Sequence, residues 1–523
     1  MSEAILPGIG YPFKEAPELL LLQPVEGAQK PPGSNSRSVA HPDRLPVEIL
    51  CKIFESCVDQ VSNGESETER VSWMKITHVS RYWREVALDH ASLWSNISFI
   101  HPELAKVMLI RSRNSPLIIR FRRSESEEEP RPVLDLALSQ ASRLKVIEVM
   151  PGPGTPSDLE FAWVLRTIGT TAPILEKLTM WNHVRVANRY SFPKALLAGF
   201  VPALRRIEFR EMDIPWGDIT VCWPTRLTHF TLSFCRCGSL ADIFRAMSKM
   251  ASLELVHFNR CLPELSQSTI WSTSIELPQL SSLVLTDSPI TLAAFFSGLK
   301  LPRIALISLS FTDASQSEVG SCLTQVKESM ELVGLKGRSP AITSLGMGHI
   351  RRRREFLIDV EWCNATDIFF EPASHGDQVD ITSLSSTRLS PRLELSFASG
   401  SQDVPLDRLL TLIDDAFSLT RLTTVHLAAA DKKLISNECE QLFRTFARCP
   451  VLQDIHFTET PIKHFLTVLG DSEVDSSVDP GYRTPAREVF LFPALARLSF
   501  LPPRLENGRL VSEAAFSWPR QSV

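Results

Sequence analysis

The residues of this sequence best suited to chemistry are its 10 cysteines and 12 histidines, because thiolates and imidazoles serve as nucleophiles, proton-transfer groups and zinc ligands. Cys235 and Cys237 lie two positions apart, but neither a second cysteine pair nor histidines accompany them at the spacing of a zinc site. The phosphate-binding G-x-x-x-x-G-K-[ST], the nucleophile elbow G-x-S-x-G and the zinc-binding H-E-x-x-H do not occur. The sequence therefore predicts a protein that is not an enzyme and that uses no metal or cofactor.

Two further groups of residues are open to a functional and to a structural interpretation. Four histidines, His229, His257, His426 and His456, lie at polar positions of short strands. They are either contact residues for a ligand on a sheet surface or members of an ordinary solvated sheet face. The basic run 351–354 is either a nuclear-import or anion-binding patch or an ordinary surface turn.

The elements that position most of these residues are strands with one recurring pattern: an apolar residue, two mostly polar residues, an apolar residue, a polar residue and an apolar residue. Six copies begin at Leu144, Leu175, Leu204, Leu227, Leu253 and Leu280, at intervals of 31, 29, 23, 26 and 27 residues. This period is typical of leucine-rich repeats, in which each unit supplies a strand and a helix. We therefore predict an α/β solenoid with parallel strands on its concave face and helices on its convex face.

A second block of the same pattern begins at Leu422, Leu452 and Leu495, and apolar residues at helical spacing precede its first two strands. Between about residues 313 and 391 the pattern weakens, although 356–362 alternates like a strand. Cys235 and Cys261 follow their strands at the position where the repeat template has asparagine or cysteine, so we expect both to be buried and structural.

The N-terminal part of the chain carries a different pattern. Leu45, Ile49 and Ile53 recur every fourth residue, with Leu50 and Phe54 beside them, which predicts an amphipathic helix. A second helix is predicted from the spacing of Ile76, Val79, Trp83 and Val86. A segment of about 50 residues cannot bury this much apolar surface by itself. We therefore expect a second polypeptide to cover part of it.

This N-terminal segment resembles the F-box, specifically the F-box-like variety that is abundant in fungi. The matching pieces are Leu45-Pro46-x-Glu48-Ile49-Leu50, Ile53-Phe54, Val79-Ser80-Arg81-x-Trp83-Arg84 and Leu93-Trp94. The family's usual short connection after the first helix is replaced here by the polar stretch 59–72, which predicts a longer surface loop.

The resemblance implies that the segment docks on a Skp-type adaptor and, through it, on a cullin in a ubiquitin ligase. The residues expected to form the adaptor-binding face, or the small core beneath it, are Leu45, Pro46, Ile49, Leu50, Ile53, Phe54, Val79 and Trp83. The expected organisation is a disordered proline-rich segment (1–40), an F-box-like module (41–98) and a leucine-rich-repeat-like solenoid (99–523) that is irregular around 313–391.

Composition narrows the class of protein further. The chain has 523 residues, a net charge of -5 and 44% hydrophobic residues, so it is expected to fold as a globular protein without a general affinity for nucleic acid or membrane surfaces. The cysteine usage fits a reducing compartment, and no apolar run reaches the length of a signal-peptide core or a membrane span. We expect a cytoplasmic or nuclear protein.

Two functions from different classes are consistent with these observations. The first is a non-catalytic substrate receptor of a Skp/cullin/F-box ubiquitin ligase, in which the repeats hold an unknown target protein near an enzyme supplied by other subunits. The second is a leucine-rich-repeat interaction scaffold without a ligase role, in which the N-terminal helices only cap the repeats.

Overall fold

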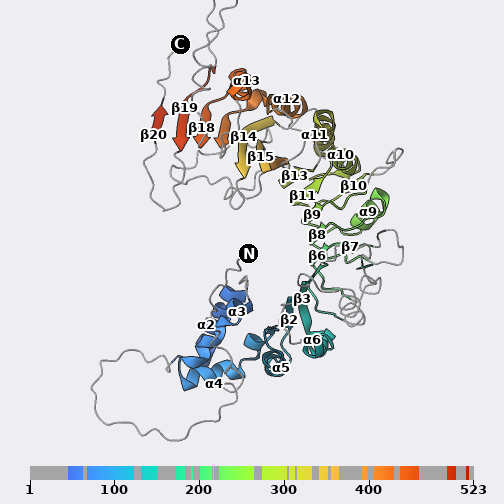
Figure 1. Ribbon diagram of the computed structural model, residues 1–523, viewed down its shortest axis with the longest axis vertical. Coiled ribbons are helices and arrows are strands. Elements are labelled where there is room, and N and C mark those ends of the chain that lie inside the picture. The colour runs from blue at the N-terminus through green and yellow to red at the C-terminus, as the bar shows by residue number, and fades with distance from the viewer. Residues whose placement is uncertain are drawn as a thin grey trace, which may run out of the picture. The chain divides into compact units, whose positions relative to one another are not determined.

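The computed structural model describes the following residues: 45–62, 67–122, 131–150, 172–182, 190–191, 201–214, 216, 223–263, 274–302, 306–312, 315–331, 341–350, 355–363, 392–397, 406–428, 436–458, 492–501 and 514–517. The chain divides into two compact units, Met1–Arg206 and Ile207–Val523. Many of their strands and helices are labelled in Figure 1.

The first unit begins with a small helical module. Its elements are α2 (Val47–Ser62), α3 (Glu67–Arg70), η2 (Ser72–His78), α4 (Arg81–Asp89) and η3 (Ala91–Trp94). The predicted first helix is therefore confirmed. The predicted second helix is divided, because Ser80 has an extended backbone and its hydroxyl accepts a hydrogen bond from the Trp83 backbone N–H at 3.2 Å, which caps α4.

The predicted loop at 59–72 is largely wrong. Helix α2 continues to Ser62, and Glu67–Arg70 and Ser72 belong to the next two helices. The reason is that Val58 and Val61 extend the apolar side of α2 by one turn and are both half-buried. Because residues 59–72 are mostly polar, the sequence did not indicate that α2 continues to Ser62.

A parallel sheet follows the module within the first unit. Its strands are β1 (Asn96–Ile97), β2 (Leu117–Arg122), β3 (Leu144–Met150) and β4 (Lys177–Trp181), paired in that order. Helices α5 (Pro102–Arg111) and α6 (Arg131–Leu138) come between the first three strands. The repeat pattern predicted β3 and β4 correctly, whereas β1, β2, α5 and α6 precede its first copy and were not predicted.

A buried carboxylate links three strands of this sheet. Glu148 on β3 forms an ion pair with Arg120, whose Nε lies 3.1 Å from a carboxylate oxygen, and accepts a hydrogen bond from the Lys177 Nζ at 2.7 Å. Arg120, Glu148 and Thr179 occupy one register row. Because the carboxylate is almost fully buried, these cations offset its desolvation and fix the pairing of the strands.

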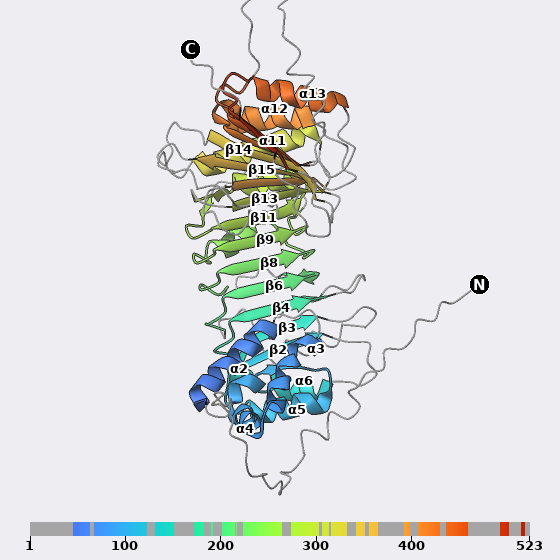
Figure 2. The same ribbon diagram turned by 90° about the vertical axis from the view of Figure 1, so that its left-hand side faces the viewer.

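The second unit contains a longer series of paired strands, which begins with β6 (Arg206–Arg210), β8 (His229–Ser233), β9 (Leu255–Asn259), β11 (Ser282–Asp287) and β13 (Leu306–Phe311). Pairing from β8 to β13 is parallel and in register, and Figure 2 shows these strands side by side. Alternate residues are buried along each strand. The predicted parallel strands are therefore confirmed.

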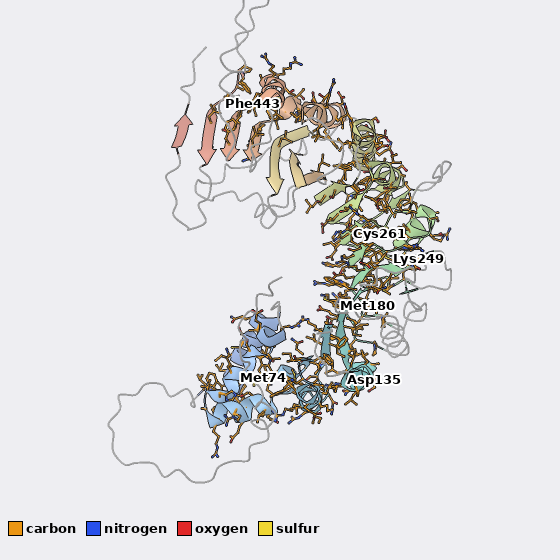
Figure 3. All side chains as sticks on the ribbon, in the orientation of Figure 1. Met74, Asp135, Met180, Lys249, Cys261 and Phe443 are labelled. Carbon is orange, nitrogen blue, oxygen red and sulfur yellow. The ribbon has the colours of Figure 1, made fainter. Side chains whose placement is uncertain are left out.

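The helices of the second unit lie along one side of this sheet (Figure 1). Among the described residues of this unit, the α-helices are α9 (Leu240–Met247), α10 (Pro289–Ser297), α11 (Gln316–Glu331), α12 (Leu406–Phe417) and α13 (Ser436–Ala447). Figure 3 places Cys261 at the strands and Lys249 outside, just past α9. The core between helices and sheet is rich in phenylalanine: Phe244, Phe258, Phe295 and Phe296 are all buried there.

The region in which the repeat pattern weakens contains a change in strand order. The sheet continues from β13 to β16 (Arg392–Phe397), β15 (Glu355–Cys363), β14 (Ala341–Ile350) and β17 (Thr424–Ala428). Strand β15 is antiparallel to both of its neighbours, whereas β14 pairs with β17 in parallel. The last strands are β18 (Asp454–Thr458), β19 (Arg497–Leu501) and β20 (Ala514–Ser517), of which β20 is antiparallel.

Successive strands of the second unit end in the same turn. Glu211, Phe234 and Arg260 follow β6, β8 and β9 and have positive φ values of 58°, 56° and 51°. Their backbone N–H groups donate to carbonyls on the next strand, those of Ser233, Asn259 and Thr286, at 2.8, 2.7 and 2.6 Å. This repeated bond offsets the cost of a left-handed conformation in residues other than glycine.

The two cysteines after these turns are structural, as predicted. Cys235 and Cys261 are buried, and the Cys235 backbone N–H donates to the Cys261 sulfur at 3.3 Å. Burial raises the pKa of the Cys261 thiol well above its usual value and that of Cys237 to about 12. Thiols held in this protonated form are poor nucleophiles.

Candidate partner-docking surface

The eight residues expected to form the adaptor-binding face divide into core and surface. Leu50 and Phe54 are fully buried. The Phe54 ring lies 5.3 Å from the half-buried Trp83 ring, centroid to centroid, so these two rings form a contact between α2 and α4. Leu50 and Phe54 support the module from inside and are not available to a partner.

The remaining members of the set include exposed apolar side chains, of which Ile49 and Ile53 form a row on α2. Ile49 and Ile53 are one helical turn apart on α2 and are 43% and 36% exposed, and Val79, between η2 and α4, is 54% exposed. Val47, which the sequence analysis missed, is 46% exposed at the first position of α2. An apolar residue directly after Pro46 was the feature of the sequence that could have identified Val47 as a member of this surface. Exposed apolar side chains that lie next to each other are typical of interaction surfaces, whereas singly scattered ones are ordinary.

The first two residues of the set lie at the start of α2. Pro46 is exposed and Leu45 is half-buried. The Tyr82 hydroxyl donates to the Leu45 carbonyl at 3.1 Å, which attaches the entry into α2 to α4. This bond holds the exposed row at the beginning of the helix in a fixed position.

The opposite end of the module is closed by aromatic and polar contacts. Trp94 is fully buried, its ring lies 5.2 Å from that of Trp73, and its indole N–H donates to the Ala87 carbonyl at 2.9 Å. On the surface, Glu55 of α2 accepts from Ser92 and contacts the His90 ring nitrogen at 3.0 Å. These bonds make the module a rigid support for the exposed row on α2.

The four strand histidines differ in their surroundings, although all are half-buried. His426 and His456 are register partners on β17 and β18, and their rings stack at 4.4 Å with an interplanar angle of 10°. Burial and the neighbouring ring lower the pKa of His426 to about 4. Burial also lowers the pKa of His456, and Arg497 adds to this effect while Asp454 opposes it. Both rings are neutral near pH 7.

This histidine pair makes the stability of the second unit dependent on pH. Because the pKa of each ring is lower in the folded chain than its ordinary value of 6.5, the unfolded chain binds more protons below about pH 6.5. The free energy of unfolding should therefore fall as the pH decreases from about 6.5 to about 4, by an amount on the order of 1 kcal/mol. Urea unfolding at about pH 7 and about pH 5 measures the effect. His426→Asn should reduce it, and an unchanged pH dependence in that variant would contradict the assignment.

Within the described part of the chain, no group of three or more His, Cys, Asp and Glu side chains is arranged to hold a metal ion.

A cavity lined by Arg70, Val71, 96–98 and Arg120 measures ≈ 10 Å³, which is room for about one water molecule. None of the helices in the described ranges is both long and apolar enough to cross a bilayer. The basic run 351–354 lies outside the described residues.

Comparisons with known proteins agree with the identity of the module. Residues 42–100 match the family model described as F-box-like, so the chain contains an F-box-like domain and the resemblance of its N-terminal segment is confirmed. A solved structure of an LRR protein from Leptospira interrogans is similar at 12% identity, covering 71% of this chain and 92% of that one, with a TM-score of 0.22. No curated protein matches the chain.

Proposed function

We propose that this chain is the substrate-receptor subunit of a Skp/cullin/F-box ubiquitin ligase and has no catalytic role of its own. The observation that carries the proposal is the exposed row of Ile49 and Ile53 on α2, together with the exposed Val79, in an F-box-like domain. An apolar surface of this kind gains free energy when a partner removes it from water. In the F-box family that partner is a Skp-type adaptor, which connects the receptor to a cullin.

The second half of the proposal concerns the target protein. We infer that the strands and helices downstream of the module form a leucine-rich-repeat solenoid that holds an unidentified target. Helices cover one side of the sheet, which leaves the half-buried polar residues of the strands as the recognition surface. The assignment of the module to the fungal variety, the domain boundaries at residues 41, 98 and 99, and a cytoplasmic or nuclear location remain predictions.

The adaptor contact can be tested with one substitution and a matched control. Ile53→Asp places a charge in the exposed row, and we expect it to weaken binding of a purified Skp-type adaptor by about 10- to 100-fold, or about 1.4–2.8 kcal/mol. Ile110→Asp introduces the same change at a 75% exposed position of α5 and should leave binding unchanged. Calorimetric titration of the adaptor into each full-length variant measures its dissociation constant.

Two outcomes would count against the ligase role. If Ile53→Asp bound the adaptor as tightly as the parent chain, the exposed row would not be the docking surface. If the parent chain did not bind the adaptor at all, the alternative of a repeat scaffold with a helical cap would be favoured. Hydrogen exchange of the α4 amides serves as the folding control for each variant.

A further inference from the structure

The inference concerns the position next to the stacked histidines on the polar face of the second unit's sheet. The two rings are 4.4 Å apart and nearly parallel, which is close to the spacing of about 4.8 Å between neighbouring strands. Each additional strand therefore offers one more place in the same stack. On one side of the pair, beyond His456, the register row continues to Ser499 of β19.

On the other side of the pair, the row continues to a glycine. Gly346 of β14 is the register partner of His426, and buried Leu345 pairs with buried Val425. Because successive residues of a strand face opposite sides of the sheet, Gly346 shares the face of His426. Glycine has no side chain, so β14 contributes nothing to the stack at this place. Gly348, two residues later, lies on the same face of the sheet. We call this place the Gly346 position.

The residues around the Gly346 position define the kind of group that fits it. On one side lies the face of a neutral imidazole ring, because the pKa of His426 is about 4. On the other side the register row continues to Asp359 of β15 and Glu394 of β16, so the next two places belong to acidic residues. A flat group that stacks on a ring and carries positive charge is complementary to both sides.

We propose that the Gly346 position binds an arginine side chain of a partner protein, with the guanidinium plane stacked on the His426 ring. A guanidinium is planar and weakly hydrated, whereas a lysine ammonium is a compact charge that cannot extend a ring stack. The inference depends on the proposed receptor function only in that it takes this partner protein to be the target. Binding of arginine itself is independent of the adaptor.

The test is a titration of the full chain, labelled with ¹³C in its histidine rings, with a hexa-arginine peptide. We expect the ring resonances of His426 to shift most and those of His456 less, while His229 and His257 remain unchanged. A hexalysine peptide of equal charge should bind about 10-fold more weakly, because stacking is lost.

Two variants fill or remove the site. Gly346→Leu places a side chain in the stack, and His426→Ala removes the stacking ring, and each should weaken hexa-arginine binding by about 10-fold. His257→Ala, at a half-buried position of β9, is the matched control and should have no effect. If Gly346→Leu failed to fold, His426→Ala and the shifts of the parent chain would still decide the question.

The outcomes separate this inference from the proposed function. Equal binding of hexalysine, or a response centred on other histidines, would overturn the arginine assignment. So would binding of N-acetyltryptophan amide at His426 with no response to hexa-arginine. Because adaptor binding is measured separately with Ile53→Asp, a chain can fail either test while passing the other.

Discussion

Replacing Trp94 with alanine is expected to destabilise the F-box-like module by about 3–5 kcal/mol. The side chain is fully buried, contacts Trp73 edge-on, and lies 4.6 Å beneath the Arg111 guanidinium. The substitution removes these contacts and leaves the Ala87 carbonyl without the indole N–H that donates to it. Because the chain has two units and need not unfold in one step, hydrogen exchange of the α4 amides is the appropriate measurement.

A conservative variant at the same position separates packing from hydrogen bonding. Trp94→Phe keeps most of the apolar contact but loses the indole N–H, and it should cost about 1–3 kcal/mol. Adaptor binding should decrease in Trp94→Ala because the exposed row on α2 depends on the module beneath it. Protection factors in α4 that match those of the parent chain would show that Trp94 does not hold the module together.

Phe295→Ala is expected to destabilise the second unit by a similar amount, about 3–5 kcal/mol. Phe295 is fully buried on α10, and its ring lies 5.3 Å from Phe244, 6.0 Å from Phe258 and 6.2 Å from Phe296. It therefore joins two helices to strand β9. The cavity left by its removal is lined by rings whose positions the backbone fixes, so little relaxation is available.

The matched control lies on the same helix. Ile290 is 48% exposed, and Ile290→Ala should change the free energy of unfolding by no more than about 0.5 kcal/mol. Hydrogen exchange of the β9 and β11 amides measures both variants. A loss of protection in Phe295→Ala no larger than in Ile290→Ala would mean that the phenylalanine cluster does not stabilise this part of the sheet.

The sequence predicted those parts of the fold in which apolar spacing repeats. The strand pattern located β3, β4, β6, β8, β9 and β11, and again β17, β18 and β19, because the apolar positions of the pattern are buried in these strands. It did not predict the short β1, nor the order of β14, β15 and β16, because strand order depends on contacts between residues far apart in the chain. Alternation at 356–362 did predict β15, but not its antiparallel direction.

The docking surface was predicted in part for a similar reason. Helical spacing groups Ile49, Leu50, Ile53 and Phe54 together, yet only the packing against α4 shows that Leu50 and Phe54 are buried while the two isoleucines are exposed. The stacking of His426 on His456 could not be predicted from the sequence alone. His426 and His456 are adjacent only because β17 and β18 pair in register, and the importance of Gly346 follows from the same register.

The reversed order of β14, β15 and β16 has a consequence for how the second unit assembles. In a simple array each strand adds to the one made just before it, so growth proceeds along the chain. Here β13 has as its neighbour β16, which is synthesised after β14 and β15. All three strands must be in place before the sheet connects β17 to β13. The unit therefore contains a cooperative step at its centre, and closing this long loop costs entropy before any of its contacts form.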